Sequence, residues 1–123
     1  MAQQGELKTQ RPAPANDGPI QAPPEEDKSL TVENYSFNPL QSQKDLKVGN
    51  EYYKAGNYHA AEWRFRDATR WNDANTEAWL RLAEAAEKSK DPASAKEAYA
   101  KYLKLQPDAK DAADIRKKLA KLK

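Results

Sequence analysis

Residues 46–65 of the chain read LKVGNEYYKAGNYHAAEWRF, and residues 80–99 read LRLAEAAEKSKDPASAKEAY. The two stretches align without a gap when the sequence is shifted by 34 residues. Matched positions carry small or apolar side chains in both copies: Leu46 and Leu80, Val48 and Leu82, Gly49 and Ala83, Ala61 and Ala95, Phe65 and Tyr99. A period of this length predicts a stack of helical hairpins, because one hairpin is too small to bury its own apolar face.

The composition narrows the class of protein. A chain of 123 residues with 38% hydrophobic and 33% charged residues has room for one small domain and is polar for a compact globule. The absence of cysteine excludes disulfides, thiol catalysis and thiolate metal sites. Residues 1–41 carry three Lys/Arg against six Asp/Glu, and residues 42–123 carry eighteen against thirteen. This mild basic excess does not indicate a nucleic-acid partner.

The sequence leaves the cellular location open. No apolar run is long enough to span a bilayer, so no membrane insertion is expected. Residues 1–6 lack the basic and apolar regions of a signal peptide. The protein is expected in the cytoplasm if Met1 is the native start. It is expected in a bacterial cell envelope or periplasm, with a lipid tether as one form, if a signal peptide was trimmed.

The first 41 residues differ in composition from the rest. They contain six of the eight prolines, interspersed with Gln, Ala, Asp and Glu. Apolar side chains are too few to offset the entropy of ordering, so we predict a disordered tether over residues 1–41. Within it, residues 30–40 include Tyr35, Phe37 and Leu40, and are predicted to form an extended strap against the first helices.

Helical periodicity begins near residue 43. Gly56 is a typical residue after a helix end, Asn57 and Asn75 can cap helix starts, and Asp91-Pro92 places a cap before a proline at the first helical position. Pro107 should close the fourth helix, and Asp108 can cap the fifth. The expected helices span residues 43–55, 58–71, 76–89, 92–105 and 109–122. Five helices with short links predict an all-α body.

The hairpins resemble the tetratricopeptide repeat, whose 34-residue pattern is W-x₂-L-G-x₂-Y…A-x₃-F…P. A first repeat at residues 42–75 and a second at 76–109 place the following residues on the pattern: Val48, Gly49, Tyr52, Ala61, Phe65 and Ala68, then Trp79, Leu82, Ala83, Ala95, Tyr99 and Pro107. The resemblance implies stacked hairpins that form an α-α superhelix. The layout of tether and repeats also resembles that of small bacterial envelope proteins.

Four positions depart from this pattern, at Asp45, Asp73, Ala86 and Tyr102. Tyr102 replaces a small residue, which suggests that the second repeat meets something other than a further repeat. Residues 110–123 are predicted to form a capping helix. Its apolar stripe should cover Tyr99, Tyr102 and Leu103, and consists of Ala112, Ile115, Leu119 and Leu122.

Candidates for catalysis are few. His59 is the only histidine, so neither a Ser-His-Asp arrangement nor a multi-histidine metal site can be built. No glycine-rich phosphate loop is present. The chain is therefore predicted to be a non-catalytic scaffold with no cofactor and no metal.

The resemblance implies that a peptide or protein partner binds a concave groove lined by the first helix of each hairpin. The predicted groove residues are Lys47, Asn50, Tyr53, Lys54, Arg81 and Glu84. Some relatives clamp a C-terminal carboxylate there. Asn50 and Arg81 match parts of that clamp, whereas Leu46, Lys47 and Glu77 do not. A generic peptide groove is therefore the prediction.

A second surface is predicted on the second helix of the first hairpin. It consists of His59, Trp63, Arg66 and Arg70, and a tryptophan beside arginines is typical of interface hot spots. Two interpretations stay open. The strap at residues 30–40 covers Trp63, or this surface joins a second copy in a homodimer or a larger complex. The second interpretation makes the chain a structural or assembly subunit.

Overall fold

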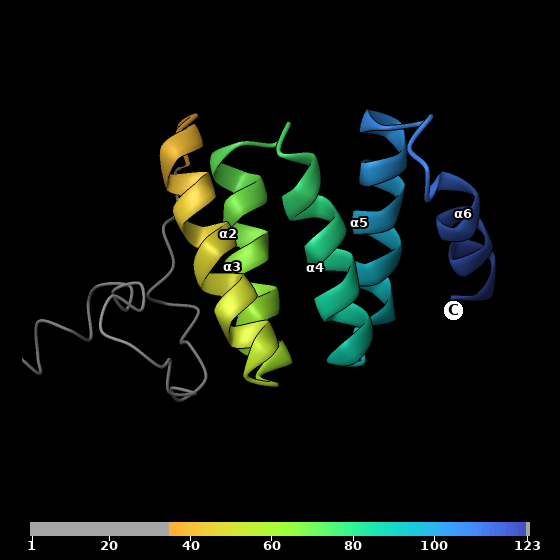
Figure 1. Cartoon of the computed structure of the whole chain (residues 1–123), viewed down its shortest axis with the longest axis horizontal. Helices are drawn as coiled ribbons and strands as arrows, with labels where there is room; N and C mark the ends of the chain where they lie inside the picture. The colour runs from red at the N-terminus through yellow and green to blue at the C-terminus, as the bar shows by residue number, and fades with distance from the viewer. Residues whose placement is uncertain (1–34, 123) are drawn as a thin grey trace, which may run out of the picture.

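The structure is a computed structural model that describes residues 35–122. This part of the chain forms five α-helices and no β-strand. With the labels of Figure 1, they are α2 (Pro39–Lys54), α3 (Tyr58–Trp71), α4 (Thr76–Lys88), α5 (Pro92–Leu105) and α6 (Ala112–Lys121). The predicted all-α fold is confirmed. Most of the predicted tether lies outside the described residues.

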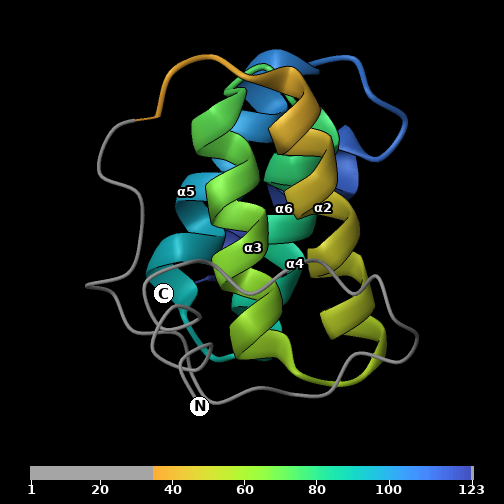
Figure 2. The ribbon, with the colours of Figure 1, turned by 90° about the vertical axis from the view of Figure 1, so that its left-hand side faces the viewer.

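The helices are arranged as stacked hairpins in two layers. They follow one another along the long axis, from α2 at one end to α6 at the other (Figure 1). Seen from the α2 end, α2 and α4 lie on one side of the stack and α3 and α5 on the other (Figure 2). We refer to the outer side of α2 and α4 as the α2–α4 face.

Small side chains bring the helices together. Ala61, Ala83 and Ala95 are fully buried, as the 34-residue pattern predicts. A Cβ added to Gly49 would lie 2.6 Å from Cδ1 of Phe65, which is also fully buried. Glycine is therefore required at this position for α2 to approach α3 as closely as it does.

The first helix starts earlier than expected. It begins at Pro39 rather than Gln43, because Asn38 Oδ1 accepts a hydrogen bond of 3.0 Å from the backbone N–H of Gln41. Asn38-Pro39 thus repeats the combination of cap and proline seen at Asp91-Pro92, where Asp91 accepts from the N–H of Ser94. The caps predicted at Asn57 and Asn75 are confirmed.

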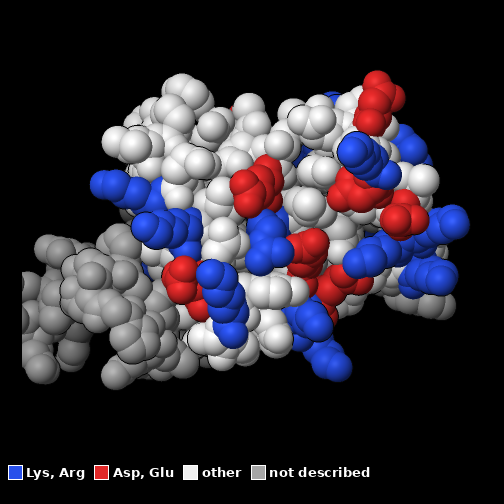
Figure 3. Space-filling view, in the orientation of Figure 1, with Lys and Arg blue, Asp and Glu red and all other residues white. Residues whose placement is uncertain are grey.

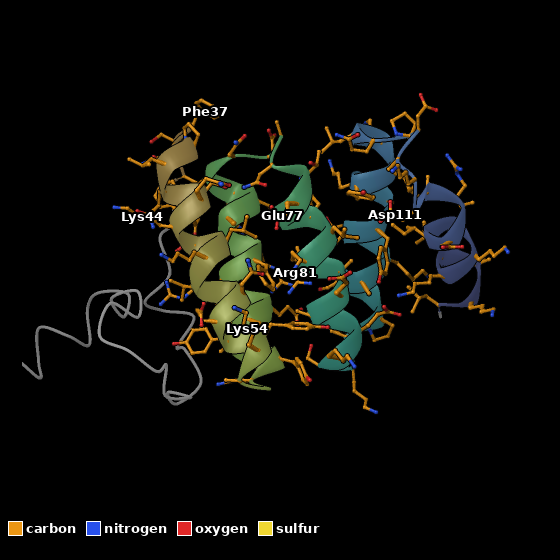
Figure 4. All side chains as sticks on the ribbon, viewed as in Figure 1. Phe37, Lys44, Lys54, Glu77, Arg81 and Asp111 are labelled. Atoms are coloured by element: carbon orange, nitrogen blue, oxygen red, sulfur yellow. The ribbon has the colours of Figure 1, made fainter. Side chains whose placement is uncertain are left out.

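The predicted strap is only partly correct. Pro39 and Leu40 are helical rather than extended, and Phe37 and Leu40 are 73% and 70% exposed instead of packed. Figure 4 shows Phe37 beside the N-terminal end of α2. Tyr35 does contact the body: its hydroxyl donates to Asp67 Oδ1 at 2.8 Å, and its ring packs edge-on against Trp71 at 4.7 Å.

Helix α6 covers the end of the second hairpin. Ala112 and Ile115 are buried, and the Tyr102 hydroxyl donates to Asp111 Oδ1 at 3.0 Å. This hydrogen bond explains why the large side chain of Tyr102 replaces a small one. The helix begins at Ala112 rather than Ala109: the residue before it is Asp111 instead of the predicted cap Asp108, and the Asp111 side chain makes no capping hydrogen bond.

The first hairpin contains a buried ion pair that the sequence pattern did not predict. Arg64 Nη1 lies 3.3 Å from Asp45 Oδ1, and each side chain is only 2% exposed. Asp45 occupies the position at which the repeat pattern has tryptophan. Charged groups are tolerated in such a place when they are paired, because an unpaired buried charge is costly.

A second polar cluster joins the two hairpins. The Glu62 carboxylate on α3 accepts hydrogen bonds from Arg66 at 2.8 Å and from Ser89 at 2.5 Å, and Arg66 also donates to Ser94 on α5. Burial raises the pKa of Glu62, and a hydrogen bond with Asp91 raises it further. The same hydrogen bond lowers the pKa of Asp91.

Candidate binding surfaces

Arg81 lies at the centre of the α2–α4 face. Its Nε donates to Asn50 Oδ1 on α2 at 3.0 Å, and its Nη1 contacts Glu84 Oε1 at 2.6 Å. Figure 4 shows Arg81 between α2 and α4, with Lys54 on the α2 side and Glu77 on α4. The structure thus brings three predicted groove residues into direct contact with one another.

Aromatic rings adjoin this guanidinium. The Arg81 guanidinium carbon lies 4.7 Å from the centre of the Tyr53 ring, within the range of a cation–π contact. Tyr53 also packs edge-on against Tyr58 at 5.0 Å, and Lys88 Nζ lies 5.8 Å from the Tyr58 ring. Tyr58 was not among the predicted groove residues. The contact of Tyr58 with Tyr53 follows from the turn at Gly56, which brings the start of α3 beside the end of α2.

The two predicted groove lysines are less tightly held. Lys47 is exposed, and Lys54 Nζ lies 3.7 Å from Glu51 at a mostly exposed site. An ion pair this exposed contributes little to stability. Lys47 and Lys54 can therefore reorient toward a partner, whereas Arg81 is positioned by its neighbours.

Charges of both signs are interspersed over the α2–α4 face. Figure 3 shows Lys/Arg and Asp/Glu side chains alternating across it, and an uncharged area over the start of α2. The face therefore has no field of a single sign. It would select a partner by the positions of polar groups rather than by net charge.

Of the two interpretations of the second predicted surface, the one that requires an exposed Trp63 is not supported. Trp63 is only 9% exposed, so the exposed tryptophan of a hot spot is not present. Arg66 is held by Glu62 and Ser94, whereas His59 and Arg70 are exposed. The four residues do not form one continuous exposed patch, because the side chain at their centre is buried.

A cleft of about 430 Å³ lies on the opposite side of the stack from the α2–α4 face, between α3 and α5. Leu82 and Trp79 of α4 contribute to it from the interior, and Tyr35 from the segment before α2. Of its lining, only Arg66 and Arg70 were predicted as site residues. Its other charged residues include Glu97 and Lys101, which are four residues apart on α5. This spacing places both residues on one face of α5. Together with Arg66 and Arg70 on one face of α3, it could have indicated a shared charged surface from the sequence alone.

Within residues 35–122, no group of three His, Cys, Asp or Glu side chains is placed to hold a metal ion. None of the helices α2–α6 combines the length and the apolar content that crossing a membrane requires.

Stacked antiparallel hairpins with a closing helix define a helical-repeat protein. The family model described as Tetratricopeptide repeat matches residues 52–122, more than half of the chain. The chain belongs to the tetratricopeptide repeat family. The match includes α6 as well as the second hairpin. Members of this family are generally non-catalytic modules that bind proteins or peptides. No curated protein matches the chain.

Proposed function

We propose that this protein is a non-catalytic interaction module that binds a peptide or protein partner on its α2–α4 face. The observation that carries the proposal is the position of Arg81. Its guanidinium is held by Asn50 and Glu84, yet its side chain remains 27% exposed. Within residues 35–122, no acceptor is hydrogen-bonded to Arg81 Nη2, so this group can donate to a partner.

A side chain held in this way loses little conformational freedom when a partner binds. Arginine and tyrosine are also the residues that most often dominate binding energy at interfaces. Arg81 and Tyr53 are in contact, so one partner group could engage both. We expect an acceptor such as a carboxylate or a backbone carbonyl at Arg81, and an apolar or aromatic group against Tyr53.

The geometry does not favour a terminal-carboxylate clamp of the kind found in some relatives. Asn50 and Arg81 are the two residues that match that clamp, and they bond each other. A carboxylate would have to compete with Asn50 and Glu84 for the same guanidinium. Recognition of an internal peptide segment fits the face better, because it requires only one further hydrogen bond, donated by Arg81 Nη2 to a peptide acceptor.

The test begins with the full-length chain and a displayed library of random peptides. Selected peptides are then titrated into the chain and its variants by calorimetry. Arg81→Gln and Tyr53→Leu should each weaken binding by about tenfold, since hot-spot truncation costs more than ~1 kcal/mol. Arg116→Gln on α6 removes the same charge at the other end of the stack, and should leave the affinity unchanged. Circular dichroism would verify that each variant remains helical.

Two results would count against the proposal. One is that selected peptides bind the Arg81 and Tyr53 variants as tightly as the parent. The other is an equal loss in Arg116→Gln, which would indicate general charge attraction. The alternative role as an assembly subunit through the second predicted surface has less support, because Trp63 is buried.

A further inference from the structure

The cleft between α3 and α5 is not part of the binding site proposed on the α2–α4 face. Its volume of about 430 Å³ is within the range of ligand-binding pockets. Its walls come from two helices of neighbouring hairpins, so it exists only because the hairpins are stacked. A site of this kind is absent from either hairpin alone.

Two cations at the walls lack a carboxylate partner in residues 35–122. Arg70 on α3 is in contact with the Tyr35 ring, at 5.6 Å from the ring centre, and Lys101 on α5 lies 5.9 Å from the Trp79 ring. Both side chains are exposed and line the cleft. By contrast, Arg66 is already hydrogen-bonded to Glu62 and Ser94, so it forms part of the wall and is not available to pair with a ligand.

An aromatic ring of fixed orientation, that of Trp79, lines the cleft together with these cations. Trp79 Nε1 donates to the backbone carbonyl of Asp73 at 2.8 Å, which prevents the indole from turning. Buried Leu82 adds an apolar surface beside it. An apolar group placed against Trp79 would therefore have Lys101 close by, with Arg70 on the other wall of the same cleft.

We propose that this cleft is a second binding site, for an acidic peptide segment of a partner protein. An aliphatic or aromatic side chain of the peptide packs against Trp79, and carboxylates on either side pair with Arg70 and Lys101. Charge complementarity favours this occupant, because the cleft presents its unpaired cations at the two walls. The site is separate from the α2–α4 face, so the chain can engage two segments at once.

Carboxylates in the lining sharpen the specificity. Asp73 and Glu97 also line the cleft, against the three cations Arg66, Arg70 and Lys101. Because Arg66 is already paired with Glu62, Asp73 and Glu97 balance Arg70 and Lys101, and general attraction for anions is weak. Only a ligand with carboxylates near Arg70 and Lys101 gains from the arrangement, because carboxylates placed elsewhere would meet Asp73 or Glu97.

The probe is a synthetic pentapeptide, Asp-Glu-Leu-Asp-Glu with blocked ends, and its control is the amide analogue Asn-Gln-Leu-Asn-Gln. Binding to the full chain is followed by the NMR signal of the Trp79 indole N–H, assigned with Trp79→Phe. The acidic peptide should shift this signal, more weakly as salt is raised, and the amide analogue should not. Arg70→Gln and Lys101→Gln should each weaken binding by about threefold to fivefold.

Lys104→Gln provides the matched control, since it removes the same charge from an exposed position of α5 that does not line the cleft. The proposal is supported if Lys104→Gln binds like the parent. It is overturned if Lys104→Gln weakens binding as much as Lys101→Gln, if the Trp79 signal does not move, or if Arg81→Gln rather than Arg70→Gln abolishes the shift.

The chain itself contains one competing acidic segment, Glu25-Glu26-Asp27. A full-length triple variant, Glu25→Gln with Glu26→Gln and Asp27→Asn, tests whether that segment is the occupant. If the triple substitution moves the Trp79 signal without peptide and tightens peptide binding, the cleft is occupied by the chain's own acidic segment and the assignment to a partner protein is wrong. An unchanged signal and affinity support the partner.

Discussion

Gly56 and Lys90 have the same left-handed backbone conformation, with φ of 84° and 65°, at positions 34 residues apart. The hydrogen bonds around them also correspond. Gly56 N–H donates to the carbonyl of Tyr53 and Asn57 N–H to that of Tyr52, as Lys90 N–H does to Glu87 and Asp91 N–H to Ala86. Each hairpin therefore turns through the same helix-ending motif, but only the first has the glycine that suits it.

Lys90→Gly is expected to stabilise the protein. A side chain in the left-handed region costs about 1–2 kcal/mol, part of which is offset by the greater flexibility of glycine in the unfolded chain. We expect the free energy of unfolding to rise by about 0.5–1 kcal/mol, measured by urea denaturation. Lys90→Ala is the control, because it removes the charge without relieving the backbone. A gain of the same size in Lys90→Ala would contradict the explanation.

Gly49→Ala is expected to destabilise the first hairpin. The new methyl group would overlap the Phe65 ring, which is fully buried and cannot move into solvent. Overpacking costs about 1–3 kcal/mol, and the higher helix propensity of alanine returns about 1 kcal/mol. Thermal unfolding should show a net loss. When Phe65→Leu is already present, Gly49→Ala should lower the free energy of unfolding by less than it does in the parent, because the ring that the methyl group would overlap is gone.

Stability should depend on pH through Glu62. Because burial raises its pKa in the folded state, Glu62 favours folding while it is protonated, and this contribution is lost as pH rises through the folded-state pKa above 4.5. The lowered pKa of Asp91 acts in the opposite direction, and its contribution is lost as pH falls below 3.8. The pair therefore contributes most in mildly acidic solution.

Glu62→Gln tests this behaviour, since glutamine resembles the protonated acid. The difference in unfolding free energy between the variant and the parent should shift in favour of the variant as pH rises from about 4.5 to 7. Chemical denaturation at a series of pH values measures it. A difference that stays constant over this range would show that Glu62 does not titrate differently in the folded state.

Tyr102→Phe should loosen α6. The substitution removes the hydrogen bond to Asp111, which is worth about 0.5–1.5 kcal/mol. Because α6 lies at the end of the stack, the effect should appear as faster amide hydrogen exchange in Ala112–Lys121, with less change in α3 and α4. Tyr53→Phe removes a hydroxyl for which the described residues supply no hydrogen-bond partner, so exchange in α6 should be unaffected.

Much of the fold could be predicted from the chain alone, because helix pairing depends on local periodicity. The spacing of Gly49, Ala61 and Phe65 predicted which helix faces meet, and the caps at Asn57 and Asn75 predicted where helices begin. The start of α2 was missed although its signal, Asn38-Pro39, is local. The alternation of Tyr35 and Phe37 just before it favoured an extended segment instead.

The candidate sites could be predicted only as lists of residues. Asn50 and Arg81 were named for the same groove, but their hydrogen bond joins residues 31 apart and follows from the packing of α4 against α2. Whether Trp63 is exposed or covered stayed open, because a position on the outer side of one helix says nothing about what lies over it, and only the structure shows the side chain to be 9% exposed.

The sequence by itself determined the helical-repeat architecture, since a 34-residue period of small and apolar residues allows few other ways to bury them. Only the tertiary structure decided which charged side chains remain available to a partner. Arg64 is buried against Asp45, Arg66 is held by Glu62, and Arg70 reaches the cleft, although all three lie on one helix. The reason is physical: Asp45, which pairs with Arg64, and Ser94, which bonds Arg66 alongside Glu62, come from other helices, and so does the α5 wall that faces Arg70.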